Sequence, residues 1–298
     1  PVDGLWAVCL AVLIPAILYN GVRSHPQMMA VALSVWSLVF FLRDRWFPSL
    51  VISPLLAVLA FYTKQSQIAL PIAMVLYLAW NRRQWLLPYV SVGLAAGLVP
   101  FLWLQKATGG LFFLDAFRLA NLSFDPAAIP VELLHWAGPA FLFIGVAVVS
   151  LWRRFRQKQW GALDWYLACS FPITIFSLGR AGAHSQYVVE LAFAVLLYLL
   201  HTTRFPDIKG KEALIAVQIL CLFGYGLAFI SIEEGPKTFA SYRAADDVFS
   251  LLKNDSDPIL SEQGSFPLFS RGRVYIQLFH FVGLWRVGLW DQSLLLKD

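Results

Sequence analysis

The side chains best suited to bind a charged substrate gather in one short stretch of the sequence, residues 179–190. Its sequence is GRAGAHSQYVVE, and it lies between two long apolar runs. The groups that could hold a substrate here are Arg180, His184, Gln186, Tyr187 and Glu190. Arginine and histidine can donate hydrogen bonds to an anion, and the glycines allow the backbone to approach a ligand closely. We therefore take this stretch as the main candidate for a substrate site.

Glu190 is the most informative residue of the stretch, because it lies one turn inside the apolar run that follows. An unpaired charge at the centre of a bilayer costs about 2.5–3.5 kcal/mol, and less near its edge. We therefore expect a basic partner for Glu190, either Lys64 or Arg180. Such a pair would either border a substrate pocket or only hold two helices together, and the sequence leaves both interpretations open.

Lys64 and Gln65 occupy the turn between two apolar runs, AVLAFY and IALPIAMVLYLAW. A lysine at the mouth of such a helix hairpin could hold a phosphate through its charge and three donors. It could also only extend its ammonium to the membrane interface. We include both residues among the candidates for binding a donor substrate.

Metal and nucleotide chemistry find no support in the motifs of the sequence. No second histidine or cysteine pair at ligand spacing accompanies His184, so we predict no metal site. Cys9, Cys169 and Cys221 all lie in apolar runs, where cysteine is a small buried hydrophobe. There is no Walker loop, nucleophile elbow or dinucleotide fingerprint, and the sequence does not indicate any particular cofactor.

The composition is that of an integral membrane protein. Hydrophobic residues make up 59% and charged residues only 14% of the chain, against roughly 25% charged residues in soluble domains. The net charge of +5 arises from short loops between apolar runs and not from one basic face, so the sequence predicts no nucleic-acid partner.

Apolar segments of helical length recur along residues 1–232 and predict an all-α polytopic membrane bundle of about nine transmembrane helices. They lie at about residues 4–20, 26–42, 48–62, 66–80, 85–104, 133–152, 160–178, 186–202 and 212–232. Residues 233–298 alternate helical and strand-like patterns and predict a small extracytoplasmic α/β domain, which we expect to be incomplete. Because the first residue is Pro1, we expect the chain to begin within a longer protein.

The basic residues predict the orientation of the bundle. Eleven of them fall in one set of alternate loops and five in the other, which places the first set in the cytoplasm. The loop containing Lys64, the loop at residues 105–132 and the loop at residues 179–186 then share the outer face with the C-terminal tail. The longest of the three, 105–132, is expected to form a partly helical lid on the membrane, and the alternative is a disordered or simply interfacial loop.

Several segments of the chain resemble polytopic GT-C glycosyltransferases of bacteria, the group that contains aminoarabinose transferases and relatives of protein O-mannosyltransferases. The resemblance is carried by AFYTKQSQIALPIAMVLYLAWNRR, ATGGLFF and GAHSQYVVEL, and in the tail by PILSEQGSFPLFSRGRVYIQ and GLWD. Gln186 stands where asparagine is commoner in that group. The resemblance covers nearly the whole chain through short motifs.

The resemblance implies a hexosyl- or pentosyltransferase in the cytoplasmic membrane. Such an enzyme would take a sugar from a polyprenyl-phosphate donor and pass it to a glycan, lipid or protein acceptor of the cell envelope at the outer face. It would use an acidic residue of the first outer loop, which has no counterpart here, so we expect this chain to be inactive as a fragment. Asp115 and Asp125 lie on the expected side, but no motif identifies either as the base, and the catalytic residue stays unknown.

Two other functions fit the same hydrophobic pattern. One is a transporter or flippase whose substrate path is lined by Lys64, Arg180 and Glu190. Transporters often contain internal repeats and paired helix breaks, and the sequence shows neither. The other is an O-antigen ligase or polymerase, which shares the substrate class but usually lacks a terminal α/β domain.

Overall fold

The structure, a computed structural model, describes residues 10, 11, 13, 14, 16, 17, 26–113, 124–180, 185–202, 209–229 and 250. These residues are mostly helical and contain no β-strand. They contain only an isolated antiparallel bridge between Phe124 and Arg180. The predicted all-α character is therefore observed wherever the structure describes residues 1–232.

The chain divides into two compact units. The first comprises Pro1–Phe112 and Ser123–Tyr225, and the second comprises Phe113–Leu122 and Gly226–Asp298. The structure describes only Phe113, residues 226–229 and Ser250 of the second unit. The α/β domain predicted over residues 233–298 thus lies, apart from Ser250, outside the described residues, and it stays a prediction.

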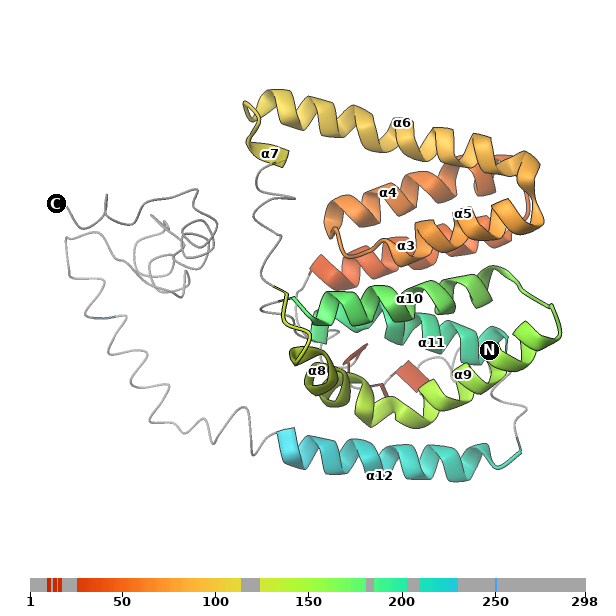
Figure 1. Ribbon diagram of the computed structural model, residues 1–298, viewed down its shortest axis with the longest axis vertical. Helices are drawn as coiled ribbons and strands as arrows, with labels where there is room; N and C mark the ends of the chain where they lie inside the picture. Colours follow the sequence, from red (N-terminus) through yellow and green to blue (C-terminus); the bar gives the residue numbers. More distant parts are fainter. Residues whose placement is uncertain are drawn as a thin grey trace. The chain divides into compact units, whose positions relative to one another are not determined.

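The helices of the first unit follow the apolar runs of the sequence closely (Figure 1). In chain order they are α3 (Pro26–Leu42), the π-helix η1 (Pro48–Ile52), α4 (Ser53–Thr63), α5 (Ala69–Asn81), α6 (Arg83–Ala107), α7 (Leu111–Phe113), α8 (Ala128–Ala137), the 3-10 turn η3 (Gly138–Ala140), α9 (Phe141–Arg156), α10 (Ala162–Leu178), the 3-10 turn η4 (Ser185–Tyr187), α11 (Val189–His201) and α12 (Lys211–Phe229). The first predicted run, at residues 4–20, lies largely outside the described residues.

One predicted run is not a single helix. The segment expected at residues 133–152 is split into α8 and α9 by the 3-10 turn at Gly138–Ala140. This turn contains a proline, which has no N–H to donate to the preceding turn of an α-helix. The hydrophobic pattern continues across the break, so it could not reveal the interruption.

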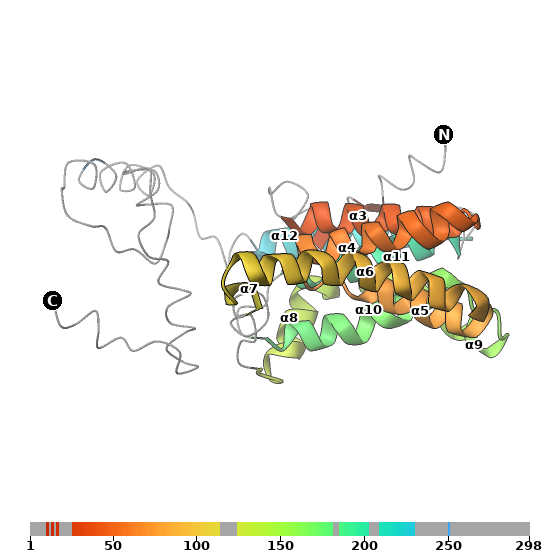
Figure 2. The ribbon, with the colours of Figure 1, turned by 90° about the horizontal axis from the view of Figure 1, so that it is seen from above.

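The long helices lie side by side and run along a common direction, as Figure 2 shows from a second side. α10 packs against both α5 and α11, while α4 packs against α3 and α6. α11 is the most enclosed of them, because nine of its thirteen residues are buried. The core of the unit therefore lies around α5, α10 and α11.

α6 has the opposite character, because only Tyr89 is buried along its 25 residues. Large apolar side chains, among them Val99, Leu102 and Trp103, are more than half exposed. At 1.5 Å per residue the helix is about 37 Å long, enough to cross a hydrocarbon layer of about 30 Å. It is the one helix of the described residues that is both long and apolar enough to span a membrane, while α3, α5, α10 and α11 are apolar but shorter. The count of nine spans remains a prediction.

The three loops predicted to share one face do meet at one end of the first unit. Lys64 contacts Gln186, the ring of Tyr62 stacks on that of Phe112 at 6.4 Å between centroids, and Phe124 forms its backbone bridge with Arg180. We call this the Lys64 end. In the 105–132 loop α6 continues to Ala107, α7 follows, and residues 114–123 lie outside the described residues. The role of this loop as a lid stays a prediction.

Candidate functional site at the Lys64 end

Lys64 lies where α4 ends and the chain turns toward α5. Its backbone N–H closes α4 by donating to the carbonyl of Ala60 at 2.9 Å, and its own backbone is extended, with φ −156° and ψ 119°. Its ammonium donates to Oε1 of Gln186 and lies 5.4 Å from the centroid of the Tyr187 ring. The structure thus brings together three predicted site residues from two distant parts of the chain.

No carboxylate neutralises the Lys64 ammonium within the described part of the chain. The ion pairs found there join Arg82 to Asp44, Arg154 to Asp164, and Lys211 to Glu212. Loss of water around the half-buried ammonium lowers the pKa of Lys64 to about 8. An amide oxygen and an aromatic face offset only part of that lost hydration, so the site favours a further, anionic partner.

Glu190 lies in the first turn of α11, is only 3% exposed, and binds the start of α5. Its Oε1 accepts a hydrogen bond from the backbone N–H of Leu70 at 3.3 Å. The first N–H groups of a helix have no partner within the helix and carry partial positive charge, so a carboxylate is stabilised there. The expectation that Glu190 pairs with Lys64 or Arg180 is wrong for the described residues, because a backbone donor takes the place of a basic side chain.

Arg180 lies apart from the Lys64 group. Its guanidinium carbon is 5.4 Å from the centroid of the Phe176 ring, and its backbone is bridged to Phe124. Gln65 is exposed, with no side-chain hydrogen bond to any described residue, and His184 is outside the described residues. Three of the predicted residues therefore meet, while Arg180 and Gln65 are not connected to them.

Gly179 allows another group to approach the backbone closely, but that group is a side chain of the protein and not a ligand. A Cβ atom at Gly179 would overlap the ring of Phe124, and the carbonyl of Gly179 accepts from the N–H of Asp125 at 2.7 Å. Phe124 also stacks on Phe176 at 5.2 Å between centroids. This glycine therefore admits an aromatic side chain from the 105–132 loop rather than a ligand.

Gln67 is a buried polar residue of this end that the sequence analysis did not single out. It is 1% exposed, its backbone N–H donates to the carbonyl of Lys64, and its Oε1 accepts from the hydroxyl of Ser34 at 3.3 Å. Its Nε2 atom has no hydrogen-bond partner among the described residues. The sequence TKQSQ contains two glutamines, Gln65 and Gln67, and this was the available signal for a polar site. Only the course of the turn shows that Gln67 faces inward.

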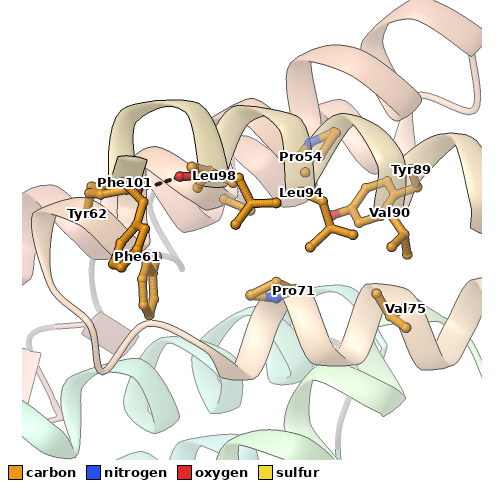
Figure 3. Close-up of a pocket in the computed structure, with 14 residues that line it drawn as sticks. Pro54, Phe61, Tyr62, Pro71, Val75, Tyr89, Val90, Leu94, Leu98 and Phe101 are labelled. Atoms are coloured by element: carbon orange, nitrogen blue, oxygen red, sulfur yellow. Dashed lines mark hydrogen bonds between the residues drawn. The ribbon is translucent and has the colours of Figure 1, made fainter. Parts of the chain in front are cut away.

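An apolar pocket of about 380 Å³ opens between α4, α5 and α6 (Figure 3). Pro71 and Val75 face Val90 and Leu94 across the pocket. Tyr62, which is two residues before Lys64 in the sequence, also lines it. The full lining is Pro54, Ala57, Val58, Phe61, Tyr62, Pro71, Val75, Tyr89, Val90, Gly93, Leu94, Gly97, Leu98 and Phe101. The hydroxyl of Tyr62 donates to the carbonyl of Gly97 at 2.6 Å, which joins α4 to α6. Such a lining suits a hydrocarbon chain.

The opposite end of the unit holds a charged network that the sequence analysis also missed. Asp164, in the first turn of α10, is 1% exposed and accepts from Arg154 at 2.8 and 3.0 Å. It also accepts from the Tyr198 hydroxyl at 2.9 Å and from the N–H of Gly161 at 2.7 Å. We call this the Asp164 end. The spacing of Gly161 and Asp164, a helix cap and an acid three residues later, was the available signal.

The described residues contain no group of three or more histidine, cysteine, aspartate or glutamate side chains that could hold a metal ion. His184, Asp115 and the residues around Asp115 lie outside this part of the chain. The absence of a metal site therefore stays a prediction.

Residues 2–104 match the family of dolichyl-phosphate-mannose-protein mannosyltransferases. This matched part of the chain is therefore similar to a family of GT-C type. The matched part includes α3, α4, α5 and most of α6, and with them Lys64 and the apolar pocket. Gln186, Tyr187 and Glu190 lie beyond it. No curated protein and no solved structure matches the chain. The match supports the resemblance seen in AFYTKQSQIALPIAMVLYLAWNRR, whereas the other motifs lie beyond the matched residues.

Proposed function

We propose that this protein is a membrane glycosyltransferase that takes a sugar from a polyprenyl-phosphate donor and passes it to an acceptor of the cell envelope. The observation that carries the proposal is the Lys64 ammonium, which has no acidic partner among the described residues and lies within the part matched by the mannosyltransferase family. The same family match favours a transferase over a transporter or a ligase.

A polyprenyl-phosphate sugar presents a single phosphate beside a long apolar chain, and this region offers a partner for each. The Lys64 ammonium supplies charge and up to three donors, of which the Gln186 oxygen takes one. The pocket between α4 and α6 supplies apolar surface, and Tyr62 on its lining is two residues from Lys64. We propose that the phosphate binds at Lys64 and that the chain enters this pocket.

The lengths of α5 and α11 support a recessed position for this site. Each has 13 residues, about 20 Å, against about 30 Å for the hydrocarbon layer. Both begin at the Lys64 end, where the Glu190 carboxylate joins them. Backbone without helical hydrogen bonding is tolerated at membrane depth only where it is enclosed by protein or lines a polar cavity. A substrate headgroup in such a cavity would be shielded from bulk water.

The other predicted site residues have less specific roles in the proposal. Gln186 and Tyr187 orient the Lys64 side chain, and Glu190 holds the start of α5. We propose that Arg180, His184 and Gln65 also contribute to binding the substrate or its donor, and we assign no catalytic base. The protein would be a multi-pass component of the cytoplasmic membrane with its C-terminal tail outside.

The test is donor binding to the purified protein in detergent, with polyprenyl phosphate as the probe. Lys64→Ala should weaken binding about 10- to 100-fold, the value of one hydrogen bond to a charged group. Lys64→Arg, which keeps the charge, should retain most of the affinity. Lys106→Ala is the control, because Lys106 is an exposed lysine in the last turn of α6.

Equal losses in Lys64→Ala and Lys106→Ala would contradict the proposal, because they would indicate a general effect of surface charge. Unchanged binding in Lys64→Ala would also contradict it, and would leave Lys64 as an interfacial lysine. A transport assay in proteoliposomes separates the remaining possibility, since a flippase would move the lipid without any acceptor.

A further inference from the structure

A second pocket, of about 830 Å³, lies at the Asp164 end, away from the candidate site. It is bounded by α9, by Thr202 after α11 and by Leu214 near the start of α12. Its wall along α9 is apolar from Phe141 to Val149, whereas its mouth carries Arg153 and glutamine side chains. The pocket thus has an apolar interior and a basic, polar rim, unlike the uniformly apolar pocket beside α6.

The two neighbouring arginines at the rim differ in what they bind. Arg154 is held by Asp164 and also donates to the carbonyl of Gln159 at 2.6 Å. Arg153 is exposed and forms no ion pair or side-chain hydrogen bond with any described residue. The side-chain amide of Gln157, one turn further on, also has no such partner. The rim therefore offers one guanidinium and an amide to an anion.

The distance along α9 from the start of the apolar wall to Arg153 is close to the thickness of one membrane leaflet. From Phe141 to Arg153 the helix rises about 18 Å at 1.5 Å per residue, close to half of a hydrocarbon layer of about 30 Å. Gly145 lies midway along this wall, and a Cβ atom added there would meet nothing within 4 Å. An acyl chain could therefore lie along α9 at Gly145 while its phosphate stays at the rim.

We propose that this pocket binds an anionic glycerophospholipid of the membrane leaflet at the Asp164 end. Its phosphate contacts Arg153 and Gln157, and one acyl chain fills the groove along α9 beside Gly145. Basic pockets between membrane helices are suited to anionic headgroups, because a lipid phosphate combines charge with an attached apolar chain. This site is separate from the sugar donor site, so the proposal does not depend on glycosyl transfer.

The test compares phosphatidylglycerol with phosphatidylcholine of the same acyl chains, titrated onto the detergent-purified protein and counted by native mass spectrometry. The unaltered protein should prefer phosphatidylglycerol. Arg153→Gln should lower that preference about fivefold, the effect of one basic residue near an anionic surface. Arg156→Gln is the matched control, because Arg156 lies in the same last turn of α9 and is exposed but does not line the pocket.

A second variant tests the chain-binding part without a change of charge. Gly145→Phe should fill the groove and lower phosphatidylglycerol binding at least as much as Arg153→Gln, with an unchanged unfolding temperature in lipid-free detergent. Inorganic phosphate at millimolar concentration should not displace the lipid. Equal losses in Arg153→Gln and Arg156→Gln, full binding by Gly145→Phe, or displacement by phosphate alone would each overturn the proposal.

Discussion

Asp164 and Glu190 are both buried carboxylates in the first turn of a helix, but their partners differ. Asp164 accepts from a guanidinium, a phenol and a backbone N–H, all at 2.7–3.0 Å. Glu190 accepts from the backbone N–H of Leu70 at 3.3 Å and has no basic partner in the described residues. At the Asp164 end the carboxylate forms an ion pair with Arg154. At the Lys64 end no ion pair joins Lys64 and Glu190 among the described residues.

This difference separates a structural contact from a site that can act on a substrate. The Asp164 network joins α9, α10 and α11, and its one carboxylate and one guanidinium neutralise each other. Near Lys64 the described residues offer no acidic partner to a cation with a lowered pKa, and perturbed cations of this kind are typical of functional sites. The predictions below test whether the two ends behave in these two ways.

The largest effect on stability is expected at Asp164. Asp164→Asn would leave the Arg154 guanidinium facing an amide, and losing one partner of a buried pair costs about 3–5 kcal/mol. Because the Arg154 side chain is 29% exposed, we expect the lower part of that range, about 3 kcal/mol. Equilibrium unfolding in mixed micelles measures this loss. A loss below about 1 kcal/mol would show that the network does not hold the three helices together.

A smaller loss is expected at Glu190, and two variants separate its causes. Glu190→Ala removes the acceptor at the start of α5 and should cost about 1–2 kcal/mol, as for other helix N-terminal acceptors. Glu190→Gln retains a carbonyl oxygen for the Leu70 N–H and should cost less than half as much. If Gln is as damaging as Ala in the same unfolding assay, the contribution of Glu190 comes from its charge at the start of α5 and not from a hydrogen-bond acceptor alone.

The role of Lys64 should appear in the pH dependence of substrate binding rather than in the stability of the protein. Its pKa of about 8 means that the ammonium is charged below pH 8 and loses its proton above it. As Lys64 loses its proton, affinity for polyprenyl phosphate should fall by about half between pH 7 and 8 and up to tenfold per pH unit above that. Lys64→Arg, which stays charged, should bind without this decline. The same decline in Lys64→Arg would assign the titration to another group.

The smallest effect is expected for the ion pair between Asp44 and Arg82, which is the exposed counterpart of the Asp164 contact. The two side chains are 54% and 34% exposed, so the pair should contribute less than about 1 kcal/mol. Asp44→Asn is the suitable variant, because Asp44 has φ 55° and asparagine tolerates that conformation.

The hydrogen bond from Arg82 lowers the pKa of Asp44, so its contribution is present at neutral pH and is lost on acidification through that pKa. High salt should weaken it further. A loss above about 2 kcal/mol in Asp44→Asn at neutral pH and moderate salt would show that exposure does not distinguish the two ion pairs.

Much of the helical architecture followed from the sequence. Apolar runs predicted α3, α4, α5, α6, α10, α11 and α12 to within a few residues, because a helix in an apolar environment must be apolar over its whole length. Alternation of basic residues also placed Lys64 and Gln186 at the same end, and their contact confirms this. The family resemblance was recognisable in AFYTKQSQIALPIAMVLYLAWNRR, the quoted motif that lies within the matched residues 2–104.

Only the tertiary structure decided which polar groups meet. Sequence spacing cannot show that the Leu70 N–H reaches Glu190, because that contact joins helices 120 residues apart. It also cannot show that Gln67 rather than Gln65 faces inward, because this depends on how the turn packs against Ser34 of α3, 33 residues from Gln67. The Asp164 network was missed for the same reason, since Arg154 and Asp164 lie ten residues apart and Tyr198 lies within the apolar run at residues 186–202. Hydrophobic pattern is a property of each helix alone, whereas the pairing of charges depends on the packing between helices.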